Sequence, residues 1–234
     1  MSGRVFLSGG GSAKQTFDLD EVFLQDLKKI LYIPLAWPND DFDSCLRWFN
    51  STMELHRKKV KVDMLTDLSR KVELKDYDAV YIGGGNTFKL LKKIKDSKFD
   101  VKLIEYYKNG GTVYGGSAGA IIWGRNIDIA RICADADVNL VGLKNTGGFD
   151  ILDGIDVQCH YSNSQSDEHK EYVKRSGRRV IAIPEDSALV VEGNKLRVIG
   201  IEPISLITEN AVKLFNVRQE FILSQLNNTK KKVT

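Results

Sequence analysis

The sequence is poor in cysteine and histidine, and both shortages narrow its chemistry. Only three cysteines occur among 234 residues, Cys45, Cys133 and Cys159, and they are widely spaced and odd in number. That pattern excludes a disulfide framework and a Cys-x-x-Cys zinc knuckle. No His-Glu-x-x-His motif or comparable cluster occurs among the three histidines, so we expect neither a metal nor a cofactor. A chain without expected disulfides is predicted to be cytoplasmic.

Long apolar runs and a strong charge excess are also absent. No stretch approaches the ~20 apolar residues that span a bilayer, and the N-terminus reaches a turn at Gly9 before a signal-length run forms. The formal net charge is +3, and three lysines stand together at residues 230–232. The remaining chain is nearly neutral, so we expect no membrane partner and no nucleic-acid partner.

What the sequence does contain is a regular alternation of strand-like and helix-like segments, with the composition of a globular protein. Apolar runs predict strands near residues 4–8, 31–36, 61–65, 78–82 and 112–116. Helical spacing predicts helices near residues 18–31, 41–56, 87–94 and 101–108. This order predicts an α/β fold with a mostly parallel, twisted sheet and helices on both faces.

The pattern changes after about residue 175. Additional short strands are predicted near residues 179–183, 188–191, 195–199 and 211–215. Gly193 and Asn194 predict a hairpin turn between the second and third of these strands. No linker composition interrupts the chain, so we predict a single α/β hydrolytic domain over residues 1–234, with about 227–234 as a flexible tail.

The most informative motif follows the predicted strand at residues 112–116. Gly115-x-Ser117-x-Gly119 matches the G-x-S-x-G nucleophile elbow, between an apolar strand and a helix that begins near Ala118. A serine on such a turn projects its hydroxyl clear of the backbone, and the small neighbours avoid collisions. We therefore predict that Ser117 is a nucleophile, and that the helix N–H groups face the developing oxyanion.

A second glycine run, at residues 83–85, also lies between a predicted strand and a helix. Such a loop can offer backbone N–H groups to an anion. It completes neither the P-loop nor the dinucleotide-binding pattern. Because parallel strands bring their carboxyl ends to one edge, we interpret it as the other half of an oxyanion hole.

A serine nucleophile needs a base and an orienting acid. His160 lies at the end of a predicted short strand, whereas His56 and His169 lie in polar segments and are expected at the surface, so His160 is the predicted base. Glu185 follows another strand end and is the predicted acid. Several aspartates between the serine and His160 remain open alternatives because chain order does not decide the geometry: Asp135, Asp137, Asp150, Asp153 and Asp156.

Together these segments resemble a known family. The resemblance rests on five segments in order, at residues 83–91, 114–120, 148–150, 160–163 and 183–185. They are similar to peptidase E, the aspartyl dipeptidase family S51, which also includes cyanophycinases. The resemblance implies a fold like the class I glutamine amidotransferase domain. It also implies a nucleophile, base and acid at Ser117, His160 and Glu185. The implied oxyanion hole lies at backbone groups of Gly84, Gly85 and Ala118, and a family aspartate falls at Asp135 or Asp137.

The resulting hypothesis is a serine peptidase that hydrolyses small peptides, in particular dipeptides with N-terminal aspartate, through a Ser-His-Glu triad. Its partner would be a small peptide substrate, and the chain would be a monomer or a homodimer. One alternative is a cyanophycinase-like or other amide or ester hydrolase with the same machinery. The other is a catalytically silent small-molecule binding domain that keeps the glycine loops for an anion.

Overall fold

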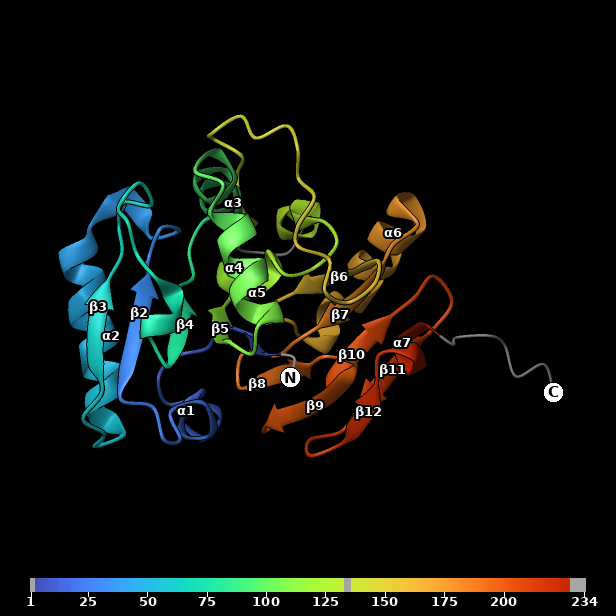
Figure 1. The fold of residues 1–234 in the computed structure, drawn as a ribbon. Coiled ribbons are helices and arrows are strands. Elements are labelled where there is room, and N and C mark those ends of the chain that lie inside the picture. Colours follow the sequence, from blue (N-terminus) through green and yellow to red (C-terminus); the bar gives the residue numbers. More distant parts are fainter. Residues whose placement is uncertain (1–2, 133–135, 228–234) are drawn as a thin grey trace.

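The computed structural model describes residues 3–132 and 136–227. Its main sheet has eight strands in the order β12-β9-β8-β1-β5-β4-β2-β3 (Figure 1). The neighbours from β1 to β3 in that order are parallel, and β8, β9 and β12 add antiparallel strands beyond β1. The strands of this sheet are β1 (Arg4–Ser8), β2 (Lys29–Ile33), β3 (Lys61–Met64), β4 (Ala79–Ile82), β5 (Thr112–Gly116), β8 (Ser187–Glu192), β9 (Lys195–Gly200) and β12 (Glu220–Ile222).

A second, four-stranded sheet has the order β11-β10-β7-β6 and lies on the right in Figure 1. β6 and β7 are parallel, whereas β10 and β11 join antiparallel. Its strands are β6 (Ile155–Gln158), β7 (Arg179–Ala182), β10 (Ile204–Ile207) and β11 (Val212–Phe215). The predicted C-terminal strands are therefore divided between two sheets.

Helices cover both faces of the main sheet. Successive strand residues point to opposite sides, and apolar side chains on both sides need to be buried. On one face, strand residues such as Val80 and Ile82 pack with α3 (Thr87–Asp96) and α4 (Phe99–Lys108). On the other, Tyr32 and Tyr81 pack with α1 (Phe17–Phe23) and α2 (Phe42–Leu55). The remaining helices are α5 (Ala118–Ile121), α6 (Ser166–Ser176), α7 (Ser224–Asn227), and the 3₁₀ turns η1 (Pro38–Asp40), η2 (Leu74–Asp76), η3 (Ile127–Arg131) and η4 (Asn163–Gln165). No helix in the described ranges is long and apolar enough to cross a membrane.

The predicted fold class is confirmed, and so is the hairpin at Gly193 and Asn194, which joins β8 to β9. The predicted helix at residues 18–31 is wrong in its extent. α1 ends at Phe23, Asp26 takes a left-handed conformation with φ of 63°, and the chain enters β2 at Lys29. Pairing with β3 and β4 on either side overrides the helical spacing there. The short strands β10 and β12 were not predicted.

Asp20, a buried carboxyl in α1, makes the stability of the fold depend on pH. Asp20 is 4% exposed, accepts a hydrogen bond from the Thr16 hydroxyl at 2.6 Å, and has no partner for Oδ1 among the described residues. Burial raises the pKa of Asp20 from 3.8 to about 6, although the hydrogen bond from Thr16 opposes the rise. Because the folded pKa is the higher one, the stability due to this carboxyl is present below pH 3.8. It is lost as the pH rises through about 6.

We therefore expect Asp20→Asn to gain stability relative to the native protein as the pH rises. The amide keeps an acceptor for Thr16 and removes the charge that burial penalises. Between about pH 4 and 7, the difference in unfolding free energy should change by about 3 kcal/mol in favour of the variant. Urea unfolding of both proteins across this range measures it. A difference that stays constant with pH would show that Asp20 does not titrate on unfolding.

Candidate active site

Three loops meet at the carboxyl edge of the parallel strands. β5 lies between β1 and β4, with Ser8 opposite Gly116 and Ile82 opposite Gly115. The segments after these strands are the glycine run at residues 9–11, the run at residues 83–85, and Ser117. The carboxyl edge is where an open α/β sheet places its ligands.

Ser117 occupies a strained turn between β5 and α5. Its φ is 51° and its ψ is −114°, outside the helical and extended regions. Such a conformation costs about 1–3 kcal/mol and persists only where the surroundings impose it. Here the Ser117 N–H donates to the Ser8 carbonyl at 3.2 Å, and its carbonyl accepts from Ala120 and Ile121. At Gly119 a Cβ would lie 2.2 Å from the Ile82 carbonyl oxygen, so the elbow can pack on β4 only with glycine at that position.

His160 follows β6 and faces the serine. Its N–H donates to the Gly9 carbonyl at 3.0 Å, and its φ of 53° lies in the left-handed region. Ser117 Oγ and His160 Nε2 are 2.8 Å apart. On the other side of the ring, Nδ1 lies 3.0 Å from Glu185 Oε1. Since a carboxylate only accepts, Nδ1 carries the proton, which leaves Nε2 free to accept the serine hydroxyl proton.

Glu185 follows β7 and is held on both carboxylate oxygens. Oε1 accepts from the His160 ring, and Oε2 accepts from Gln15 Nε2 at 2.8 Å. Gln15 is fixed in turn, because its side-chain oxygen accepts from the backbone and the hydroxyl of Ser12. Hydrogen bonds from His160 and Gln15 lower the pKa of Glu185. The carboxylate is therefore ionised at neutral pH, the form that orients an imidazole.

Backbone groups beside the serine are free to bind an anion. The N–H groups of Gly84, Gly85 and Ala118 donate none of the hydrogen bonds found in the described chain. A Cβ placed on Gly84 would lie 3.1 Å from Ser117 Cβ, so this loop runs next to the nucleophile. Two segments thus bring free N–H donors close to Ser117, and an oxyanion hole needs such donors near the nucleophile.

Gly85 and Ser117 border a cavity of about 420 Å³. Its wall includes Ser117 and His160, amide side chains of Asn86, Gln158 and Gln165, and the carboxylate of Asp137. Larger hollows of about 630 and 760 Å³ lie elsewhere and contain neither Ser117 nor His160. The cavity that contains Ser117 and His160 is large enough for a small ligand.

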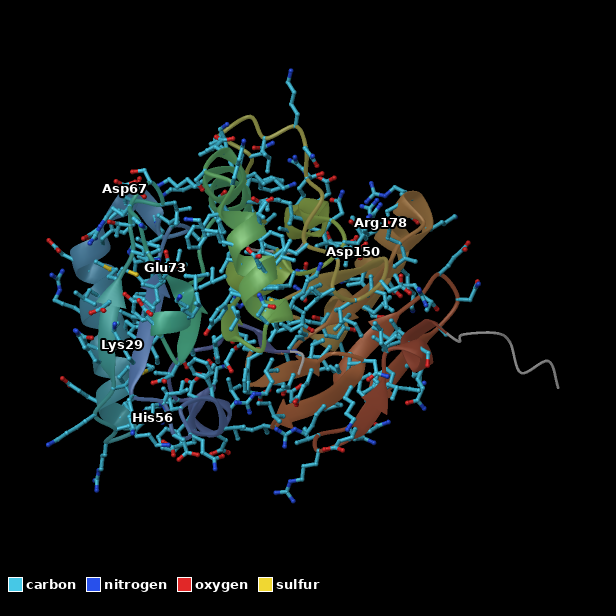
Figure 2. The ribbon with its side chains drawn as sticks, viewed as in Figure 1. Lys29, His56, Asp67, Glu73, Asp150 and Arg178 are labelled. Carbon is cyan, nitrogen blue, oxygen red and sulfur yellow. The ribbon has the colours of Figure 1, made fainter. Side chains whose placement is uncertain are left out.

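The aspartates considered as alternatives to Glu185 contact other groups. Asp137 lines the cavity, but its Oδ2 accepts from the Thr87 N–H at 2.8 Å. Asp135 lies outside the described residues. Asp150 pairs with Arg125 at 3.0 Å. Asp156 binds Arg178 and the Tyr172 hydroxyl of α6; Figure 2 labels Asp150 and Arg178. Among described residues, Glu185 is the carboxylate that contacts the His160 ring.

The expectation of surface positions for the other two histidines is wrong. His56 is 6% exposed and lies near α1, where its Nδ1 contacts Glu21 at 2.6 Å and its ring stacks on Phe17 (Figure 2). His169 is fully buried on the inner side of α6, against the ring of Tyr161. Polar neighbours in sequence suggested exposure, but the buried face of a helix is set by the elements that pack on it.

Two contributors were missed by sequence reasoning. The glycine run after β1 was interpreted only as a turn, yet Gly10 lies against both Ser117 and His160. Gln15 binds Glu185 across 170 positions of sequence, and no local pattern marks it. The signal for the first was available: β1 is a central strand, and a glycine run at its carboxyl end is a candidate site segment.

Comparisons with known proteins agree with this architecture. The model of peptidase family S51 matches residues 5–199. Peptidase E of Shewanella denitrificans is 27% identical over 187 residues, which cover 75% of this chain and 76% of the relative. Peptidase E of Pasteurella multocida is 27% identical over 203 residues, covering 80% and 82%.

Solved structures share the fold. A Listeria monocytogenes EGD-e protein assigned to peptidase E has a TM-score of 0.69 at 22% identity, covering 86% of this chain and all of that one. A peptidase from an acI-B1 Actinobacterium has a TM-score of 0.64 at 16% identity, covering 95% and 97%. The family match spans most of the chain and includes Ser117, His160 and Glu185. This protein therefore belongs to peptidase family S51.

Proposed function

We propose that this protein is a serine peptidase that hydrolyses short peptides through Ser117, His160 and Glu185. The observation that carries the proposal is the continuous hydrogen-bonded line from the Ser117 hydroxyl through the His160 ring to the Glu185 carboxylate, at 2.8 and 3.0 Å. A nucleophile, a base and an orienting acid in that relation are the parts that acyl transfer requires.

Each group has one role in the proposed reaction. His160 Nε2 takes the hydroxyl proton as Ser117 Oγ attacks the scissile carbonyl, and it then gives that proton to the leaving amine. Glu185 keeps Nδ1 protonated and stabilises the imidazolium. The N–H groups of Gly84, Gly85 and Ala118 donate to the tetrahedral oxyanion. Water then repeats the sequence to release the acyl group, with His160 again as the base.

The substrate class that the family resemblance favours is a dipeptide with N-terminal aspartate. The described lining of the cavity does not supply the positive charge that would bind an acidic side chain. It contains one carboxylate, Asp137, and neither lysine nor arginine. A preference for an acidic side chain would have to arise from neutral donors such as Asn86 and Gln165. A panel of dipeptides that differ in the side chain of the N-terminal residue therefore tests this preference.

The test is hydrolysis of a panel of dipeptides by the purified protein. Asp-Leu, Glu-Leu, Ala-Leu and Lys-Leu differ only in the first residue, and released leucine is measured. We expect turnover of at least one member, and a loss of several orders of magnitude in Ser117→Ala. Equal turnover by the variant would contradict the proposal. Cleavage of the neutral dipeptides without Asp-Leu would remove the aspartate preference alone.

A further inference from the structure

Glu185, the acid of the proposed triad, is a half-exposed residue. Its side chain is 45% exposed and that of His160 is 36% exposed, whereas the corresponding acid of the chymotrypsin-type triad is buried. Fixing one rotamer of an exposed glutamate costs conformational entropy, and water competes for its oxygens. A contact besides the one with His160 is therefore needed to hold this carboxylate in one place.

That contact comes from Gln15, in the segment between β1 and α1. Gln15 Nε2 donates to Glu185 Oε2 at 2.8 Å, while Glu185 Oε1 lies 3.0 Å from His160 Nδ1. The Gly11 N–H also donates to the backbone carbonyl of Glu185 at 3.1 Å. A carboxylate with a separate donor on each oxygen has a fixed plane, whereas with one donor it can turn about that bond.

The amide of Gln15 is itself held in one orientation by Ser12. Gln15 Oε1 accepts from the Ser12 N–H at 3.0 Å and from the Ser12 hydroxyl at 2.7 Å. Two donors on the oxygen leave the NH₂ group of the amide for the Glu185 carboxylate. Hydrogen bonds joined in a chain polarise one another, so each bond strengthens the next.

We propose that Gln15 is a positioning residue for the catalytic base, which acts by holding the Glu185 carboxylate against His160. Ser12 supports it, so the hydrogen-bonded line extends from three residues to five. Gln15 is not among the described residues that line the cavity, and it therefore acts through Glu185 rather than on the substrate. The inference rests on the proposed function, because it needs His160 to be the base.

A second explanation is that Gln15 only closes a local turn. Three other glutamines make the same local bond, in which the side-chain oxygen accepts from the N–H three positions earlier: Gln165, Gln219 and Gln225. Gln219→Met is therefore the matched control, because it removes such a bond away from the described lining of the cavity. Gln15→Met removes the local bond and also the donor to Glu185. Melting temperatures of both variants report whether the fold is kept.

The test is the rate of fluorophosphonate labelling at Ser117, which requires an activated serine and no peptide. We expect Gln15→Met to react at least about tenfold more slowly than the native protein at neutral pH, because a displaced base costs up to about 10²-fold. Gln219→Met should react within about twofold of the native rate, because its local bond does not reach Glu185.

Gln15→Glu gives a readout that a merely structural role would not move. The introduced carboxylate repels Glu185 at high pH, but once protonated its O–H can donate to Glu185 Oε2. The labelling rate of Gln15→Glu, divided by the native rate at the same pH, should rise at least about threefold as the pH falls from about 8.5 to about 5.5. The same ratio for Gln15→Met should not rise.

A native labelling rate in Gln15→Met, an equal loss in Gln219→Met, or a Gln15→Glu ratio that does not rise at low pH would overturn the inference. If Gln15→Met does not fold, the pH dependence of Gln15→Glu decides. The two proposals fail in different ways. A native protein that does not react refutes the proposed triad and this inference with it, whereas equal reaction of the native protein and Gln15→Met refutes the role of Gln15 alone.

Discussion

His160→Ala is expected to reduce peptide turnover by several orders of magnitude. Without the imidazole, nothing within hydrogen-bond distance of Ser117 Oγ can take its proton, since His160 Nε2 is the side-chain atom that contacts this hydroxyl in the described structure. Triad members act as a unit, so removing the base costs about as much as removing the nucleophile. Steady-state rates on the best dipeptide of the panel measure the effect.

The matched control is His169→Gln. His169 is buried, and its Nδ1 lies 2.8 Å from the Gln165 carbonyl, so a glutamine amide can replace that donor with a smaller packing change than alanine. Its turnover should change by less than about tenfold, with the melting temperature followed in parallel. If His169→Gln loses activity as a folded protein and His160→Ala keeps it, the base is assigned wrongly.

Gly10→Ala is expected to lower turnover by about a hundredfold or more. Gly10 has a φ of +91°, and an added Cβ would lie 2.7 Å from Ser117 Cβ and 2.9 Å from His160 Nε2. Both partners of the catalytic hydrogen bond must then move. A displacement of about 1 Å at reacting groups costs on the order of 10²-fold in rate.

Gly154→Ala is the matched control, because it places alanine in a left-handed conformation without the contact with Ser117 and His160. Gly154 has a similar φ of +85°, but no atom lies within 4 Å of its added Cβ. Both variants should lose stability through the left-handed conformation, whereas only Gly10→Ala should lose activity. A comparable loss of turnover in the two folded variants would show that the contact with Ser117 and His160 is not the cause.

The elbow could be predicted from the sequence because its geometry is local. Gly115, Ser117 and Gly119 lie within five positions, between a strand and a helix, and the constraints on all three arise there. His160 and Glu185 were predicted by their places after strand ends, and the structure brings His160 to Ser117 and Glu185 to the His160 ring.

Other features depend on contacts that no local pattern contains. Helical spacing continues to Leu31, but the chain enters β2 at Lys29 because β3 and β4 pair with that strand. The strand β12 has only three residues and exists through its pairing with β9. Gln15 lies beside Glu185 because β1 and β8 are paired, and sequence spacing does not encode this long-range pairing.

The central claim is that Ser117 is an activated nucleophile. Its most direct test is the reaction of the purified protein with a fluorophosphonate, followed by mass spectrometry of the intact chain and of its peptides. We expect one adduct, on the peptide that contains Ser117, formed quickly in the native protein and absent in Ser117→Ala. No adduct on the native protein, or an adduct of equal yield on Ser117→Ala, would contradict it.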